Sequence, residues 1–338
     1  MTGSALSHAA LLCLLGLAGS PLAAQSVRGR VVELETGRPV AGAGVQLIDP
    51  SGGRHHAVLS RSDGSFEVRA TRTGRYRLRA EMIGRQTVES DPFDAGPDLE
   101  SRHELALPPL PIAIRGLEVT GEQRCGPDIE AARDVHAVWG EVEKALRATD
   151  LTLAAAEHRF RLAEYERRRD EGSLDLVHEE ATESEVVGGQ EPFVSLEPAS
   201  LAEGGYVREE AGEIWIYGPS IAVLLDRSFV DTHCFTLRRD DDRDRMLGVA
   251  FEPLPGRAVA DLSGVLWLEE NSGELRTLEF EFVNVPETLM RGDYRGQVEF
   301  LRLDGGGWVI ERWWLRSPDP DNLFLVRERA AEILEIGG

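Results

Sequence analysis

The sequence predicts a mainly β protein with α+β character, in which an N-terminal antiparallel β-sandwich precedes a domain with a helix and an antiparallel sheet. Three observations support this fold class. Short alternating segments separated by Gly and Pro turns fill residues 26–108. An apolar repeat with helical spacing follows at Asp128–Thr149. Longer alternating segments then continue through most of residues 150–316. A length of 338 residues is sufficient for about two domains.

The amino-acid composition excludes some classes of protein and of binding partner. Hydrophobic residues make up 42% of the chain, which is typical of a folded protein and not of a disordered one. The 59 acidic and 37 basic residues give a net charge of −22, which repels phosphate backbones, so we expect no nucleic-acid partner. Lys144 is the only lysine, which we interpret as an effect of genomic base composition.

Residues 1–24 have the pattern of a signal peptide. The apolar run from Ala9 to Ala18 is shorter than the about 20 residues that span a bilayer and has the length of a signal-peptide core. The segment Leu22-Ala23-Ala24 offers a small-residue cleavage site before Gln25, although the first eight residues contain no Lys or Arg. An uncleaved anchor or a buried N-terminal helix is the alternative. No later stretch approaches 18 apolar residues, so we expect no transmembrane anchor after processing.

The region 26–108 contains about seven strand candidates with turns between them. Gly64 ends the turn Ser62-Asp63-Gly64, which is typical of a hairpin, and Gly74–Ala80 alternates with the period of two of a strand. The other strand candidates are Val27–Leu34, Gly44–Ile48, Ala57–Arg61, Ser65–Arg69 and His103–Leu107. This spacing is typical of a small sandwich.

An ordered series of short motifs runs through the same region: V-x-G-x-V at 27–31, T-G-x-P-V at 36–40, A-G-V at 43–45, D-G-x-F at 63–66 and G-x-Y-x-L at 74–78. This series resembles the carboxypeptidase regulatory-like domain, a prealbumin-like sandwich that also precedes the plug of TonB-dependent transporters. No histidine begins an H-x-x-E or H-E-x-x-H motif, so the resemblance implies the accessory domain without the peptidase and without its zinc. Such a domain implies an adhesion, folding or spacer role. We expect no cofactor and no metal.

Residues 109–124 form a Pro-rich linker, in which Gly116–Gly121 resembles the segment that follows this sandwich in TonB-dependent transporters. A plain edge strand explains that segment equally well, and the chain is too short for the large transporter barrel. We expect few contacts across the linker, so that residues 26–108 fold as an independent unit.

Residues 125–338 form the second domain, with a helix at Asp128–Thr149 and two clear C-terminal hairpins. Val265–Glu269 pairs with Glu274–Phe282, and Gln297–Leu303 pairs with Trp308–Arg316. Further expected elements are strands at 158–169, 173–187 and 246–251 and a short helix at 219–230.

The segments 264–275 and 298–310 of this domain resemble the half-barrel of periplasmic lipoprotein carriers. The resemblance implies an apolar groove, for which the candidate residues are Trp267, Phe280, Phe282 and Trp308. The alternative is that these aromatic side chains fill a closed core.

Candidate catalytic chemistry is sparse. The charge run Arg239–Arg245 lacks the EF-hand glycine, and we interpret it as a solvated loop and not as a calcium site. His233 beside Cys234 could activate a thiol, but a disulfide is the stronger interpretation for an exported protein. We therefore expect no enzyme. The leading hypothesis is a non-catalytic binding or scaffolding protein, periplasmic or associated with the outer membrane, with an unidentified envelope protein or lipid as partner. The alternatives are a lipid or lipoprotein carrier and an enzyme of unknown type.

The first prediction concerns processing. We expect the exported protein to begin at Gln25 or within two residues of it, because the apolar run ends before a small-residue cleavage site. N-terminal sequencing of material from the envelope fraction checks this. Recovery of an intact Met1 from that fraction would contradict it.

The second prediction is a disulfide between Cys125 and Cys234, the two cysteines that remain after processing. Closing a loop of about 100 residues is worth roughly 4–5 kcal/mol in the chain-entropy model. Peptide mapping without reduction should recover the linked pair. Alkylation of both thiols in the native, unreduced protein would rule the bond out.

Overall fold

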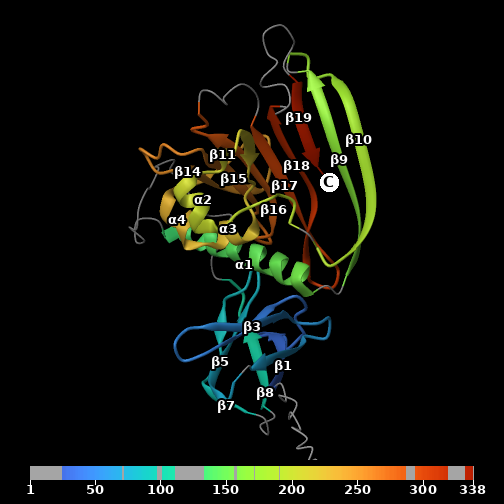
Figure 1. Cartoon of the computed structure of the whole chain (residues 1–338). Coiled ribbons are helices and arrows are strands. Elements are labelled where there is room, and N and C mark those ends of the chain that lie inside the picture. The colour runs from blue at the N-terminus through green and yellow to red at the C-terminus, as the bar shows by residue number, and fades with distance from the viewer. Residues whose placement is uncertain are drawn as a thin grey trace, which may run out of the picture.

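The computed structural model describes residues 25–70, 72–96, 101–110, 133–155, 158–170, 172–189, 191–286, 294–318 and 332–337 (Figure 1). The predicted signal peptide, Cys125 and most of the linker lie outside these residues, so the disulfide and the cleavage site stay predictions. The predicted fold class is confirmed: a β-sandwich is followed by a helix and a large antiparallel sheet.

The sandwich consists of two sheets. The first has the order β4-β1-β8, and the second has the order β3-β2-β5-β6, with β7 pairing with β5. Their bounds are β1 Gln25–Glu33, β2 Gly44–Ile48, β3 Arg54–Leu59, β4 Ser65–Ala70, β5 Gly74–Glu81, β6 Val88–Glu89, β7 Phe93–Ala95 and β8 Ser101–Leu107. Alternate residues of both sheets, such as Val31 and Leu78, are fully buried between them.

One detail of the predicted sandwich is wrong, because β1 and β8 pair in parallel. The chain reaches β8 from β7, which belongs to the other sheet, and not through a hairpin on β1. Turn residues fix the direction of strands that they connect directly. They carry no information on a strand that arrives from the opposite layer.

The second domain is a curved sheet of nine strands with helices against one face (Figure 1). The strand order is β10-β9-β19-β18-β17-β16-β15-β14-β13, and every neighbouring pair is antiparallel. The strands are β9 Arg159–Asp170, β10 Leu176–Val187, β13 His233–Arg238, β14 Met246–Pro253, β15 Asp261–Glu269, β16 Leu275–Val283, β17 Arg295–Arg302, β18 Trp308–Pro318 and β19 Glu332–Gly337. A separate hairpin comprises β11 Val207–Glu210 and β12 Glu213–Ile216.

Helix α1, Arg133–Ala155, runs across the end of the sheet and separates it from the sandwich (Figure 1). It extends six residues past the predicted end at Thr149. Thr149 and Thr152 face the core, and their hydroxyls donate to the carbonyls of Ala145 and Ala148, so burial leaves neither hydroxyl unpaired. The short helices α2 Pro198–Gly204, α3 Ile221–Leu225 and α4 Arg227–Thr232 complete the cover.

Glycine–aromatic pairs recur across the sheets. Phe280 on β16 is opposite Gly296 on β17, and Phe251 on β14 is opposite Gly264 on β15. A Cβ built on either glycine would overlap the phenylalanine ring opposite it, so each ring lies across the backbone of the neighbouring strand. The glycines thereby let large rings fill the core of a strongly curved sheet.

This packing predicts opposite effects of two Gly→Ala substitutions. Gly296→Ala should lower the free energy of unfolding by about 1–3 kcal/mol, because the added methyl displaces the Phe280 ring. Gly140→Ala is the control: this α1 position has open space, and the change should add about 0.5–1 kcal/mol. Urea unfolding measures both. Equal signs would contradict this account of the glycines.

Candidate functional site

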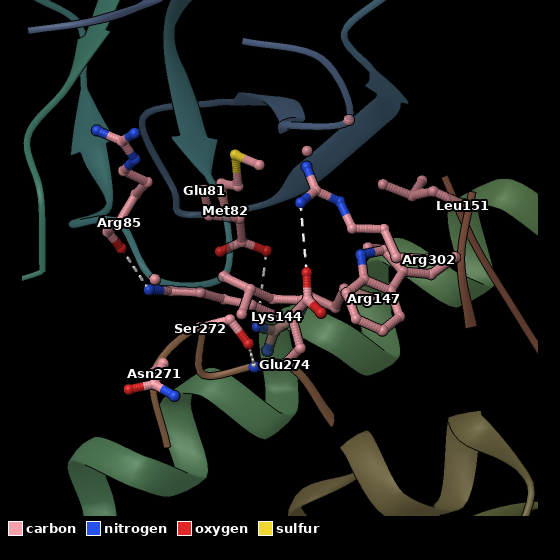
Figure 2. A pocket seen from close by; sticks show the side chains of 16 residues that line it. Glu81, Met82, Arg85, Lys144, Arg147, Leu151, Asn271, Ser272, Glu274 and Arg302 are labelled. Atoms are coloured by element: carbon pink, nitrogen blue, oxygen red, sulfur yellow. Dashed lines mark hydrogen bonds and ion pairs between the residues drawn. The ribbon is translucent and has the colours of Figure 1, made fainter. Parts of the chain in front are cut away.

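A buried ion pair joins the two domains. Glu141 and Lys144 lie one turn apart on α1, with side chains 3% and 10% exposed, and the Lys144 ammonium donates to Glu141 Oε1 over 2.6 Å. Each residue also reaches the sandwich. The Gly84 amide donates to Glu141 Oε2 over 2.7 Å. Lys144 Nζ donates to the Arg85 carbonyl over 2.7 Å (Figure 2).

One expectation is therefore corrected. The expectation of few contacts across the domain boundary is wrong, because Glu141 and Lys144 of α1 both bond to the backbone of the turn after β5. The single lysine thus has a specific structural role. Sequence spacing identified the helix, but the partners of Glu141 and Lys144 lie some 57 to 59 positions away along the chain.

Close backbone contact makes up another part of the same interface. Gly42 of the sandwich and Gly306 of the β17–β18 turn both have positive φ, 76° and 90°. A Cβ on either one would overlap the backbone of the opposite turn. The two turns can meet here because neither residue has a side chain.

A pocket of about 260 Å³ lies at this joint (Figure 2). Its lining comes from three parts of the molecule: the sandwich, helix α1, and the turns of the sheet domain. The lining includes Glu81, Met82 and Arg85 from the sandwich, Lys144, Arg147 and Leu151 from α1, and Glu274 and Arg302 from the sheet domain.

The charges of the pocket are unevenly paired. The Arg147 guanidinium lies 3.8 Å from Glu81 and 3.4 Å from Glu143, and Arg302 lies 3.3 Å from Glu274. Charge-assisted hydrogen bonds to carboxylates are usually about 2.7–2.9 Å long, so these contacts are loose. The pocket thus presents guanidinium donors that its own carboxylates satisfy incompletely.

A second polar cluster is buried deep in the sheet domain. His233 Nδ1 lies 2.8 Å from the Phe229 carbonyl, and Nε2 lies 3.2 Å from the Leu262 carbonyl and 3.3 Å from Asp261 Oδ1. Both ring nitrogens thus lie within hydrogen-bond distance of oxygen acceptors. Arg257 Nε donates to the other Asp261 oxygen over 2.6 Å.

Electrostatics in this cluster follow from burial and the opposed charges. Burial alone would raise the pKa of Asp261, but the hydrogen bond and charge of His233, with further donors from Leu262 and Arg257, hold it below its usual range. Burial, with the Asp261 charge, raises the pKa of Tyr206 well above that of a free tyrosine. His233 and Asp261 are at most 3% exposed, so the cluster pins α4, β13 and β15 together.

The thiol–imidazole pair that was the weaker alternative for His233 and Cys234 does not form. Successive residues of a strand point to opposite faces, and His233 and Cys234 are the first two residues of β13. His233 points toward Phe229 and Phe251 beneath the helices. Cys234 is buried on the opposite face, at 5% exposure, and cannot use this imidazole.

The four predicted groove residues are divided between the two faces of the sheet. Phe280, Phe282 and Trp308 belong to the main core beneath α1. Trp267 belongs to a small cluster on the opposite face, with Ala250 and Val265. All four are at most 7% exposed, so they do not line one open groove. Strand alternation explains the division, because Leu266 and Leu268 on either side of Trp267 belong to the main core.

The charge run is a loop, but its arginines are not simply solvated. Arg243 reaches back to the sheet, where it pairs with Glu279 and lies 4.7 Å over the Trp267 ring. Arg239 pairs with Glu270. In the described ranges no group of three or more His, Cys, Asp or Glu side chains is placed to hold a metal ion, and no helix is long and apolar enough to cross a membrane.

Comparison with known proteins identifies the first domain. The family model of the carboxypeptidase regulatory-like domain matches residues 26–108. These residues form a carboxypeptidase regulatory-like domain. No curated protein matches the chain in sequence. The motif series of this regulatory-like domain was thus a reliable signal, whereas its contact with α1 had no signal in the sequence.

Several solved structures match parts of this chain at low sequence identity. A LolA superfamily protein from Nitrosomonas europaea is 14% identical over 60% of this chain and 91% of its own, with a TM-score of 0.27. The 5-hydroxyisourate hydrolase from Klebsiella pneumoniae is 16% identical over 25% of this chain and 85% of its own, with a TM-score of 0.21. A DUF3823 family protein from Bacteroides ovatus is 9% identical over 68% of this chain and 91% of its own, with a TM-score of 0.21.

The joint predicts a large effect of Glu141→Gln. The amide cannot neutralise Lys144, and breaking a buried ion pair on one side should lower the free energy of unfolding by about 3–5 kcal/mol. Glu143→Gln is the control, because Glu143 is a partly exposed surface partner of Arg147 and should cost at most about 1 kcal/mol. Urea unfolding compares them; equal losses would contradict the role of the pair.

The His233–Asp261 cluster predicts a pH dependence. Because folding lowers the pKa of Asp261, its stabilisation is complete above the unfolded pKa of about 3.9 and is lost as pH falls through the lower folded value. Asp261→Asn should therefore lower the unfolding free energy by about 3–5 kcal/mol at pH 7, and this gap should shrink below about pH 4. The exposed-loop variant Asp241→Asn should show almost no gap at either pH. A pH-independent gap for Asp261→Asn would be inconsistent with this charge pairing.

Proposed function

We propose that this protein is a non-catalytic binding protein of the bacterial envelope, periplasmic or associated with the outer membrane, whose ligand binds at the joint between the two domains. The observation that carries the proposal is the pocket lined by the regulatory-like domain, α1 and the sheet domain together. A site built from both domains gives the sandwich a role beyond that of a spacer, since neither domain supplies the lining alone.

The composition of the pocket supports binding over catalysis. Its carboxylates are engaged with arginines, and its lysine is engaged with Glu141 and a backbone carbonyl. A nucleophile or general base needs a neighbouring group that activates it. This lining offers orienting donors and acceptors instead. The envelope location is supported by the signal-peptide pattern of residues 1–24. It is also supported by the resemblance of the first domain to the sandwich that precedes the plug of TonB-dependent transporters.

The experiment is native mass spectrometry of the full chain purified from the periplasm. We expect the mature protein to retain a non-covalent small molecule or partner, and Glu141→Gln, which loosens the joint, to retain less of it than Glu143→Gln. A chain that is recovered bare under gentle conditions, or that turns over a substrate, would overturn the proposal.

A further inference from the structure

We infer that the pocket at the joint binds an acidic monosaccharide, meaning a hydroxyl-rich ring with one carboxylate or phosphate group. The inference rests on the proposed function and names the ligand class for that site. It follows from three properties of the lining: donors with spare capacity, carboxylates that limit the charge of a ligand, and an apolar wall of limited size.

The spare donors come from three cations. Lys144 has three N–H groups, and two of them are used by Glu141 and the Arg85 carbonyl. Arg147 and Arg302 make carboxylate contacts of 3.3–3.8 Å, longer than a strong charge-assisted bond. Figure 2 shows these side chains converging on the pocket from α1 and from β17. An anionic group that enters would make shorter bonds than the ones that it replaces.

Two carboxylates restrict what that anion can be. Glu81 and Glu274 line the same pocket and would repel a ligand with several negative charges. Their oxygens accept hydrogen bonds from hydroxyl groups, which a sugar ring supplies in number. Arg85 is the fourth cation of the lining. It donates over 2.5 Å to Glu33, which does not line the pocket. One anionic group with several hydroxyls therefore complements the charges best.

The apolar part of the lining sets the shape and size. Met82 and Leu151 present hydrocarbon surface to the pocket, as the C–H face of a sugar ring requires. A volume of about 260 Å³ is below the roughly 300–1,000 Å³ of pockets for drug-sized ligands. The pocket thus has room for one ring and excludes a lipid chain or a long glycan.

The test uses the full mature chain and four probes: glucuronate, glucose 6-phosphate, glucose and inorganic phosphate. Isothermal titration and thermal unfolding measure binding. We expect glucuronate or glucose 6-phosphate to bind and to raise the unfolding temperature, and glucose and inorganic phosphate to bind at least about tenfold more weakly. Which acidic sugar binds more tightly distinguishes a carboxylate from a phosphate source.

Variants then locate the site. Arg147→Ala and Arg302→Ala should each weaken binding by about tenfold. Arg276→Ala is the matched control: Arg276 pairs with the same Glu274 over 2.7 Å but does not line the pocket, so affinity should not change. Because Arg302 is 37% exposed, Arg302→Gln provides the same test if Arg147→Ala fails to fold.

Three results would overturn the inference: no binding of either acidic sugar, equal affinity for glucose, or equal loss in Arg276→Ala. A different molecule retained by the periplasmic protein, together with no response to the acidic sugars, would overturn this inference and leave the proposed binding function in place.

Discussion

The ion pair between Glu141 and Lys144 is the constraint on which the arrangement of the molecule depends. Both side chains are buried against the turn after β5, and each bonds to the backbone of that turn as well as to its partner. Removing two charges from water is unfavourable unless such bonds compensate for it. The compensating bonds form only when the sandwich lies at one position on α1. The pair therefore determines the relative orientation of the two domains more than it adds to the free energy of unfolding. The pocket exists because that orientation is fixed.

The net negative charge is distributed unevenly between the two domains. Residues 26–108 contain twelve arginines and twelve acidic residues, so the regulatory-like domain has no net charge and the whole −22 belongs to the remainder. The two bodies therefore have no long-range electrostatic attraction for each other. Their association depends on short-range contacts. These include the bonds of Glu141 and Lys144 to the turn after β5, the Gly42–Gly306 backbone contact, and the packing of Leu59 and Ile83 of the sandwich against the main core.

Local pattern was sufficient for most of the fold. Alternation located the strands of both C-terminal hairpins, and ordered turn motifs identified the sandwich. What the pattern could not provide was pairing between distant segments. The parallel β1–β8 pair and the insertion of β19 between β18 and β9 both join strands that no hairpin connects. The pocket could not be predicted for the same reason, since its lining comes from three distant stretches of chain.

The contact between Gly42 and Gly306 determines how closely the two domains approach each other. A Cβ on either glycine would overlap the backbone of the opposite turn. Gly42 also lines the pocket. Any larger residue at either position would hold the sandwich away from the sheet domain, so these two glycines set the width of the pocket although they contribute no side chain to it.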